Sequence, residues 1–209
     1  MTDKLHYVRL PNAQGGRAEM VRMCYVLSGR PYIDVLHAME DAPSAVDGKN
    51  PFRQFPFVET PDGEVVYQTI AIMHHAAQGT SAWPAEPAAL TRALSVAMGG
   101  YDLYQAFGAF PADDAAGRSK FEHKQAPKYF SALAEIYAQR EFASGETPCF
   151  ADCIVHQAVA WCARRNEVSH RLLEAKPELE AFLRRFEALP EIAAFMTQQI
   201  AARRNDNTV

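Results

Sequence analysis

The sequence predicts two parts of different fold class: an α/β domain over residues 1–79 and an all-helical domain over residues 87–209, joined by a linker over residues 80–86. Strand-like and helix-like patterns alternate through the first part, which is typical of a small mixed sheet covered by helices. Strand signals disappear after residue 87, where Ala-, Leu- and Glu-rich segments of helical period follow one another. The linker itself changes in composition to Thr, Ser, Ala, Trp and Pro.

The elements of the first part follow the order strand, helix, strand, connection, two-strand hairpin and helix. We expect the strands over residues 4–9, 32–36, 57–60 and 64–67, and the helices over residues 16–27 and 69–77. Pro61-Asp62-Gly63 supplies the hairpin turn, with a glycine available for positive φ. Because a helix crosses between the first two strands, these two strands must be parallel.

The second part reads as a series of helices whose starts, stops or kinks are marked by proline, which is tolerated in a first turn and disruptive inside a helix. We expect helices over residues 87–110, 119–139, 149–164, 169–175, 177–189 and 191–203. Pro127 falls inside the second of these segments, so it either kinks that helix or marks a later start. The prediction for this part is a domain without a sheet.

Composition and charge exclude several classes of function. The chain has 209 residues, of which 48% are hydrophobic, so it can bury a sizeable core. A net charge of -4 and a pI near 6.0 give no basic surplus for nucleic acid. No stretch reaches the roughly 18 apolar residues that span a bilayer, and the first residues do not resemble a secretory signal. We therefore expect a cytoplasmic protein that binds neither membranes nor nucleic acid.

The four cysteines, Cys24, Cys149, Cys153 and Cys162, form no Cys-x-x-Cys pair, and the histidines show no complementary spacing for a metal. Free cysteines are usually interior residues, so we expect reduced, buried thiols and no metal site. The adjacent pair His74-His75 lies inside a predicted helix, where neighbouring positions do not face each other. We expect a solvent or interface role for this pair.

Four motifs of the first part are specific in combination. They are Lys4-Leu5-His6-Tyr7, Gly16-Arg17-Ala18-Glu19 at the start of a helix, residues 50–59 (NPFRQFPFVE) and Gln68-Thr69-Ile70-Ala71-Ile72. Together they resemble the amino-terminal domain of a cytosolic glutathione transferase of the tyrosine type, sigma-like branch. In the second part, residues 145–152 are similar to that family's buried capping motif, and residues 177–190 resemble its carboxy-terminal helix pair. The resemblance implies a thioredoxin-like domain followed by a helical domain, with glutathione as co-substrate, a small electrophile as second substrate and a homodimeric state.

The resemblance also assigns the residues that bind glutathione. It implies a cis bond before Pro56, with the backbone N–H and C=O of Phe55 pairing with the cysteinyl part. It gives the γ-glutamyl carboxylate and amine to Gln68 and Thr69, at the amino terminus of a helix, where unpaired N–H groups attract anions. The alternatives are a trans proline at a strand start and a Thr69 that serves only as an N-cap. Gln54 and Lys49 lie within reach of the glycyl carboxylate, although the Trp that also serves there in the sigma-like pattern is absent.

Tyr7 is the candidate catalytic residue. A thiol of pKa about 8.5 is only a few per cent thiolate at neutral pH, and a phenolic O–H donated to the sulfur stabilises the thiolate. Arg17 can lower the thiol pKa by its charge, or it can pair with Glu19 or with solvent. The segment from Val8 to Gly15 is about four residues longer than the usual tyrosine-class loop, so Asn12 or Gln14 is the alternative donor.

The helical domain contributes further candidates. Tyr101, Tyr104, Phe107 and Phe110 form an aromatic stripe that reads either as helix core or, through Tyr104 and Phe107, as the wall of an electrophile pocket. The resemblance suggests that Asp102 reaches the partner subunit's glutathione amine. We expect Asp152 to cap its helix, although Cys149 replaces the usual Ser or Thr three residues earlier and Thr147 is an alternative partner.

Two classes of function remain open at this point. The first is an enzyme that joins glutathione to an electrophile, as in detoxification, or uses it for reduction or isomerisation. The second is a non-catalytic relative that keeps the fold for binding or scaffolding. A disulfide-exchanging oxidoreductase is disfavoured because no cysteine opens the first helix. The sequence does not identify the electrophile, since one fold hosts many reactions.

Overall fold

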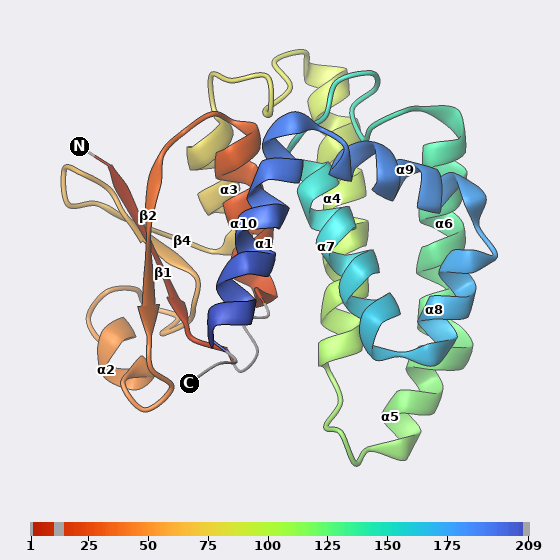
Figure 1. Cartoon of the computed structure of the whole chain (residues 1–209), viewed down its shortest axis with the longest axis horizontal. Helices are drawn as coiled ribbons and strands as arrows, with labels where there is room; N and C mark the ends of the chain where they lie inside the picture. Colours follow the sequence, from red (N-terminus) through yellow and green to blue (C-terminus); the bar gives the residue numbers. More distant parts are fainter. Residues whose placement is uncertain (1, 11–14, 207–209) are drawn as a thin grey trace. The chain divides into compact units, whose positions relative to one another are not determined.

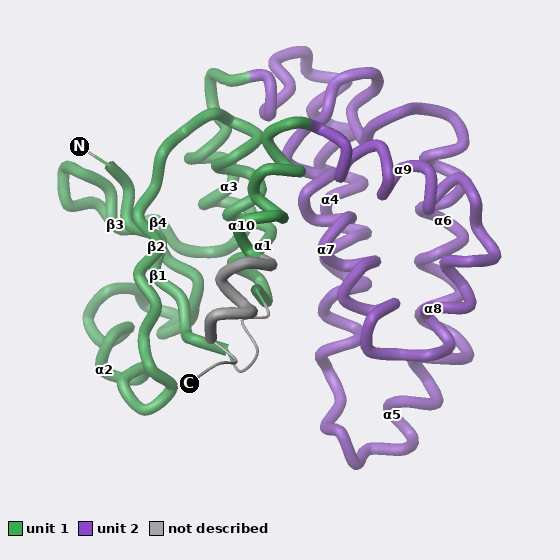
Figure 2. The backbone as a smooth tube through the Cα atoms, viewed as in Figure 1, with its two compact units in different colours: residues 1–80, 190–209 green, residues 81–189 purple. Residues whose placement is uncertain are grey.

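The computed structural model describes residues 2–10 and 15–206, with side chains up to residue 199. The chain forms two compact units, Met1–Thr80 together with Pro190–Val209, and Ser81–Leu189 (Figure 2). The last helix, α10 (Pro190–Asp206), packs against α1 (Gly16–Leu27) and is therefore counted with the first unit. We had expected this segment as the last element of the helical domain.

The first unit contains a mixed four-stranded sheet in the order β2-β1-β3-β4 (Figure 1). The strands are β1 (Asp3–Val8), β2 (Tyr32–His37), β3 (Phe57–Glu59) and β4 (Val65–Tyr67). The parallel pairing of β1 with β2 is confirmed, and β1 pairs antiparallel with β3, which forms the predicted hairpin with β4. The connection after β2 contains a short helix, α2 (Ala42–Val46), that the sequence did not predict.

Helices α1, α3 (Thr69–Ala77) and α10 cover one face of this sheet (Figure 1). Successive residues of a strand point to opposite faces, so Leu5 and Tyr7 face the helices while His6 lies on the other face. Leu5, Val58 and Ile72 are fully buried in the resulting core. The strand period of β1 thus directs Tyr7 toward the beginning of α1.

His75 connects α3 to the start of β1 through Asp3. We had expected a solvent or interface role for this residue. Its Nε2 lies 2.9 Å from Asp3 Oδ2, and the hydroxyl of Tyr25 donates to the same oxygen at 2.8 Å. This carboxylate therefore links the start of β1 to both α1 and α3.

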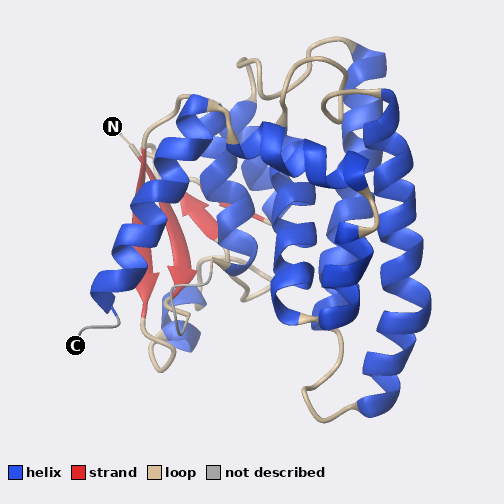
Figure 3. Ribbon diagram, turned by 45° about the vertical axis from the view of Figure 1, so that its right-hand side comes forward, coloured by secondary structure: helices blue, strands red, loops and turns tan. Residues whose placement is uncertain are grey.

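The second unit is built from helices, and every strand that the structure describes belongs to the first unit (Figure 3). Its helices are α4 (Pro87–Gly108), α5 (Ala115–Lys120), α6 (Ala126–Gln139), α7 (Phe150–Arg165), α8 (Glu167–Glu174) and α9 (Pro177–Glu187). Helix α7 is the centre of the unit: it packs against α4, α8 and α9, and most of its residues are buried.

Pro127 interrupts the helix that we had expected over residues 119–139. A π-helical turn, Phe121–Gln125, connects α5 to α6, and the N–H of Ala126 donates to the carbonyl oxygen of Phe121. Proline has no N–H for the bond that a regular α-helix needs at this place. The wider turn carries the chain past Pro127 without ending the helix, and Pro127 then lies in the first turn of α6.

Asp152 caps α7, as predicted, and is completely buried. Its carboxylate accepts hydrogen bonds from the backbone N–H of Cys149 (2.8 Å), the backbone N–H of Ala143 (2.9 Å) and the hydroxyl of Tyr137 (2.9 Å). Burial raises the pKa of Asp152 to about 6, although these three donors favour the charged form. The carboxylate ties α6 and the loop before α7 to the start of that helix.

The four cysteines are buried and free, as the sequence predicts. Within the described residues, no group of three or more His, Cys, Asp or Glu side chains is arranged to hold a metal. In the same part of the chain, no helix is both long and apolar enough to cross a membrane.

Candidate functional site

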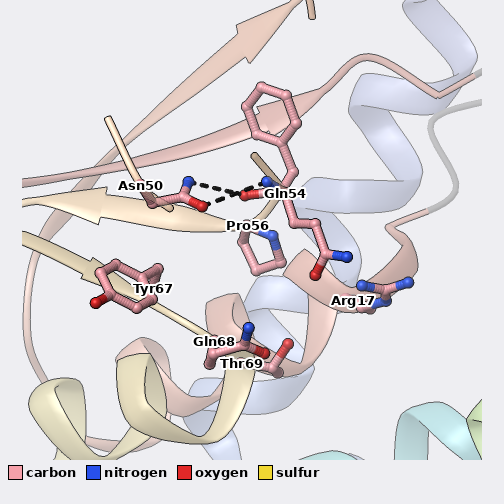
Figure 4. Close-up of a pocket in the computed structure, with 8 residues that line it drawn as sticks. Arg17, Asn50, Gln54, Pro56, Tyr67, Gln68 and Thr69 are labelled. Atoms are coloured by element: carbon pink, nitrogen blue, oxygen red, sulfur yellow. Dashed lines mark hydrogen bonds between the residues drawn. The ribbon is translucent and has the colours of Figure 1, made fainter. Parts of the chain in front are cut away.

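A hollow in the first unit collects residues from three separate segments of the chain (Figure 4). The hollow is small and partly open to solvent. The lining residues come from the start of α1, the loop before β3, the end of β4 and the start of α3. They are Arg17, Asn50, Gln54, Phe55, Pro56, Tyr67, Gln68 and Thr69. Most of the first-unit residues assigned from the sequence therefore meet at one place.

The amino terminus of α3 forms one wall of the hollow. Gln68 is the N-cap residue but makes no side-chain capping bond, and its φ of 75° is unusual for a residue other than glycine. Thr69 is the first helical residue, so it is not the N-cap, and its hydroxyl has no hydrogen-bond partner among the described residues. The first N–H groups of a helix have no acceptor within the helix. This wall is therefore a ready binding place for an anion.

The loop over residues 50–56 forms the opposite wall. The Phe55–Pro56 bond is cis, as the resemblance implies. In the part of the chain that the structure describes, neither the N–H nor the C=O of Phe55 has a hydrogen-bond partner. Both groups belong to a residue that lines the hollow, so they are available to a bound molecule.

Tyr7 lies beside the hollow without being part of its lining. Its side chain is 8% exposed, and its ring meets the Phe55 ring edge-on at 6.3 Å between centroids. The backbone N–H of Arg17 donates to the Tyr7 hydroxyl at 3.2 Å. The hydroxyl thus accepts one hydrogen bond from the start of α1, and a phenolic O–H is by its chemistry both an acceptor and a donor. The alternative donors Asn12 and Gln14 lie outside the described residues.

Gly16 makes this contact possible. It has a φ of 50°, and a Cβ at this position would overlap the Tyr7 hydroxyl oxygen. Only glycine allows the backbone of α1 to approach the phenol so closely while it adopts this left-handed conformation.

Arg17 lines the hollow and forms no ion pair with any described residue. No ion pair between Arg17 and Glu19 occurs among the described residues, and Glu19 binds Arg22, with 3.0 Å between Nη1 and Oε2. Arg22 is also bound to Asp34 at 2.9 Å, and its guanidinium carbon lies 6.0 Å from the centre of the Tyr7 ring. Arg22 thus connects α1 to β2 beside the Tyr7 ring, and Arg17 takes no part in this ion network.

Lys49 and Gln54 differ in their placement. Gln54 lines the hollow, whereas Lys49 does not, and its Nζ lies 2.5 Å from Glu59 Oε1 on β3. This ion pair, in which Lys49 lowers the pKa of Glu59, ties the beginning of the loop to the sheet. A role for Lys49 at the glycyl carboxylate stays a prediction that requires Lys49 to leave Glu59.

The candidates of the second unit lie along α4. Asp102 is exposed. Tyr104 is half-buried and packs on Trp161 with 5.9 Å between ring centroids, and Phe107 packs on Phe121 at 5.1 Å. These rings take part in helix packing and keep some exposed surface, so both interpretations of the aromatic stripe stand. The roles of Asp102, Tyr104 and Phe107 stay predictions.

Sequence reasoning missed two lining residues, Asn50 and Tyr67. Asn50 belongs to the motif on which the resemblance rests, and the Asn-Pro pair signals a turn, but nothing local shows which backbone groups its amide binds. Tyr67 ends β4 immediately before Gln68. This position next to a predicted binding residue was the signal that could have identified it.

Comparison with known proteins supports this architecture. Residues 101–199 match the family described as glutathione S-transferase, C-terminal domain. The structure is similar to rat hPGDS complexed with a quinoline (TM-score 0.81, 20% identity, covering 95% of this chain and 97% of that chain). It is also similar to the Pi-class glutathione S-transferase of Onchocerca volvulus (TM-score 0.82, 20% identity, covering 97% of this chain and 96% of that chain). A third similar structure is the glutathione S-transferase of Ascaris lumbricoides (TM-score 0.78, 21% identity, covering 95% of this chain and 98% of that chain). No curated protein matches the chain significantly.

These comparisons establish the class of fold. The chain has a thioredoxin-like amino-terminal domain with a mixed four-stranded sheet, followed by a helical domain that matches the glutathione S-transferase carboxy-terminal domain over residues 101–199. At about 20% identity, the structural likeness shows the fold and leaves activity and substrate to the chemistry of the site.

The close approach of Gly16 to Tyr7 gives a first prediction. Gly16→Ala should lower the free energy of unfolding by about 2–5 kcal/mol, because the methyl group adds a steric overlap to the cost of a left-handed residue. Gly29→Ala is the matched control: Gly29 has a φ of 63° with nothing near its absent Cβ, so it should cost only about 1–2 kcal/mol. Urea denaturation measures both variants. Equal losses would show that Gly16 is needed only for its φ.

Proposed function

We propose that the protein is a glutathione transferase that binds glutathione in the hollow and activates its thiol for attack on a small, hydrophobic electrophile. The observation that carries this proposal is the pairing of two free sets of backbone groups across one hollow: the uncapped start of α3 on one wall, and the N–H and C=O of Phe55 on the other. A peptide with a carboxylate at one end satisfies both sets. The thioredoxin-like fold and the matching carboxy-terminal domain support this choice of ligand.

The orientation of glutathione follows from the charges and donors around the hollow. Its γ-glutamyl carboxylate binds at the start of α3, held by Gln68 and Thr69. The cysteinyl backbone pairs with Phe55, and the glycyl carboxylate lies toward Gln54. Arg17, without an ion pair among the described residues, adds positive charge beside the ligand. This orientation leaves the cysteinyl sulfur to be directed toward Tyr7.

The mechanism needs only that the thiol ionises at neutral pH. The Arg17 N–H already occupies an acceptor site on the Tyr7 oxygen, which makes the phenol a stronger donor to the sulfur. The thiol proton leaves to solvent, and the phenolic O–H stabilises the thiolate. With an aryl halide, the sulfur–carbon bond then forms while the carbon–halogen bond breaks and halide departs. Tyr7 and Arg17 are the catalytic residues in this account, and no protein nucleophile is required.

The electrophile is expected to be apolar. The half-buried rings of Tyr104 and Phe107 support this choice, as does the quinoline in the similar rat protein. We expect the enzyme to work in the cytoplasm, where its buried thiols stay reduced. A non-catalytic protein that binds glutathione is the second candidate function, since the same backbone groups serve both, and only thiol activation separates them.

Thr69→Ala tests the binding of glutathione. The variant removes a hydroxyl that is placed to donate to a carboxylate, a bond worth about 1.5–3 kcal/mol, so affinity should fall roughly ten- to a hundredfold. Thr69→Ser keeps the hydroxyl and should bind within about threefold of the parent, which is a smaller change than the tenfold minimum expected for the alanine variant. Isothermal titration calorimetry measures the glutathione affinity of both variants and of the parent. Unchanged affinity in the alanine variant would mean that the γ-glutamyl group is held elsewhere.

Tyr7→Phe tests thiol activation. The ring packing is preserved, so glutathione should still bind, while the pKa of the bound thiol returns toward about 8.5. If the lost shift is about two units, turnover of an aryl halide at pH 6.5 falls by a factor on the order of a hundred and recovers partly at high pH. Tyr129→Phe, in α6, is the control and should behave as the parent.

Absorbance titration of the bound thiolate measures the pKa of the glutathione thiol directly, without an electrophile. A Tyr7→Phe variant with near-full activity at pH 6.5 would assign the donor to the Val8 to Gly15 segment. A parent protein that does not lower the thiol pKa would favour the non-catalytic function.

We also propose that the protein is a homodimer, because in similar enzymes the site is completed across the subunit interface, here through Asp102. Sedimentation at micromolar concentration should give about twice 23.2 kDa. A monomer with full turnover would contradict this assignment.

A further inference from the structure

Asn50 is a buried polar residue of the hollow to which the proposed function assigns no role. Its side chain is enclosed, with the residue 6% exposed, and it lines the hollow beside Gln54 (Figure 4). Its amide makes three hydrogen bonds, all to the backbone of the loop that follows. Oδ1 accepts from the N–H of Phe52 at 3.1 Å and from the N–H of Gln54 at 3.4 Å, and Nδ2 donates to the carbonyl oxygen of Gln54 at 3.2 Å.

The last of these bonds controls a group that a ligand needs. The carbonyl of Gln54 and the N–H of Phe55 belong to the same peptide unit, which is planar. In a trans peptide, these two groups point in opposite directions. Nδ2 of Asn50 holds the carbonyl on one side, and the Phe55 N–H is thereby directed to the other side, away from Asn50. This is the N–H that has no partner in the described part of the chain.

The loop has a strained backbone that needs such a support. Arg53 has a φ of 49°, a left-handed conformation that is uncommon for a residue other than glycine. Its side chain is largely exposed and, among the described residues, forms one ion pair, with Asp47 at 3.3 Å on the surface, where an ion pair contributes little. The Asn50 amide bonds the loop on both sides of Arg53, at Phe52 and at Gln54. Together with the backbone bond from the Arg53 N–H to the Asn50 carbonyl oxygen at 3.2 Å, these side-chain bonds hold the strained turn in place.

We propose that Asn50 is a positioning residue of the glutathione site: by fixing the peptide unit between Gln54 and Phe55, it directs the Phe55 N–H toward the cysteinyl carbonyl of the ligand. This inference rests on the proposed function for the identity of the ligand. In this account the Asn50 side chain sets the direction of the Phe55 N–H. The account also explains why all three hydrogen bonds of the buried amide go to the backbone of one loop.

Asn50→Asp is the sharpest test, because aspartate keeps the two accepted bonds and changes only the third. A carboxylate oxygen in place of Nδ2 cannot donate to the Gln54 carbonyl and repels it. Glutathione affinity, measured by calorimetry, should fall at least tenfold in Asn50→Asp and in Asn50→Ala. In the parent, glutathione should slow hydrogen exchange of the Phe55 N–H, and in Asn50→Asp this protection should be lost.

Asn166→Ala is the matched control. Asn166 lies in the second unit, where its amide also makes three bonds, to the N–H and the hydroxyl of Ser169 and to Glu122. Replacing Asn166 by alanine removes three hydrogen bonds of a part-buried amide, as Asn50→Ala does, but away from the hollow. Glutathione affinity should therefore stay within twofold of the parent. A general loss of stability would lower binding in both variants, whereas a positioning role lowers it only at Asn50.

The outcomes separate this inference from the proposed function. If the parent binds glutathione and Asn50→Asp binds it within twofold, Asn50 has no positioning role. If the parent binds no glutathione, the proposed function fails. Exchange of the Phe52 and Gln54 N–H groups without ligand then decides whether Asn50 holds the loop: faster exchange in Asn50→Ala supports that role, and unchanged exchange overturns it. If Asn50→Ala does not fold, glutathione affinity and Phe55 protection are measured in Asn50→Asp alone, because this variant retains the acceptors of the Phe52 and Gln54 N–H groups.

Discussion

The contact between the start of α1 and the Tyr7 hydroxyl is the constraint on which the candidate site depends. A strand places Tyr7 on the helix-covered face of the sheet, and the helix must then approach the phenol closely enough for the Arg17 N–H to reach it at 3.2 Å. Gly16 allows this approach because it has no Cβ and tolerates a φ of 50°. The same turn carries the Arg17 side chain to the hollow, so one backbone arrangement sets the acceptor bond of the phenol and the position of the charge.

Backbone groups supply much of the binding capacity of the hollow. The start of α3 offers N–H groups without a side-chain cap, and Phe55 offers one donor and one acceptor. Each wall contains or adjoins a residue with positive φ, Gln68 on one side and Arg53 on the other. Strained residues other than glycine persist where surrounding interactions over-determine them, often at functional sites. The two strained positions thus agree with a hollow that is formed in advance of its ligand.

Long periodic patterns made most of the fold predictable. The strands, the parallel pair and all the long helices follow from apolar spacing and from proline and glycine positions. The missed elements are those that tertiary context decides. Helix α2 has only five residues, and a π-helical turn is one of several conformations in which a helix can accommodate the missing N–H of Pro127. The assignment of α10 to the first unit rests on its packing against α1, which no local pattern reveals.

The candidate site was predictable where its chemistry is local. The helix start at Gln68-Thr69 is visible in a few adjacent residues, whereas the cis bond at Phe55-Pro56 was predicted from the family resemblance. Contacts between distant segments are not visible in this way: the bond from Arg17 to Tyr7 spans a loop, and Lys49 pairs with a glutamate on another strand. Asn50 was missed for the same reason, since its role appears only when the partners of its amide are known.

A crystal structure with bound glutathione tests the central claim most directly. The account predicts that the γ-glutamyl carboxylate lies at the N–H and hydroxyl of Thr69, that the cysteinyl carbonyl accepts from the Phe55 N–H, and that the sulfur lies within hydrogen-bond distance of the Tyr7 hydroxyl, about 3.0–3.5 Å. A ligand bound elsewhere, or bound in the hollow with its sulfur directed away from Tyr7, would contradict it.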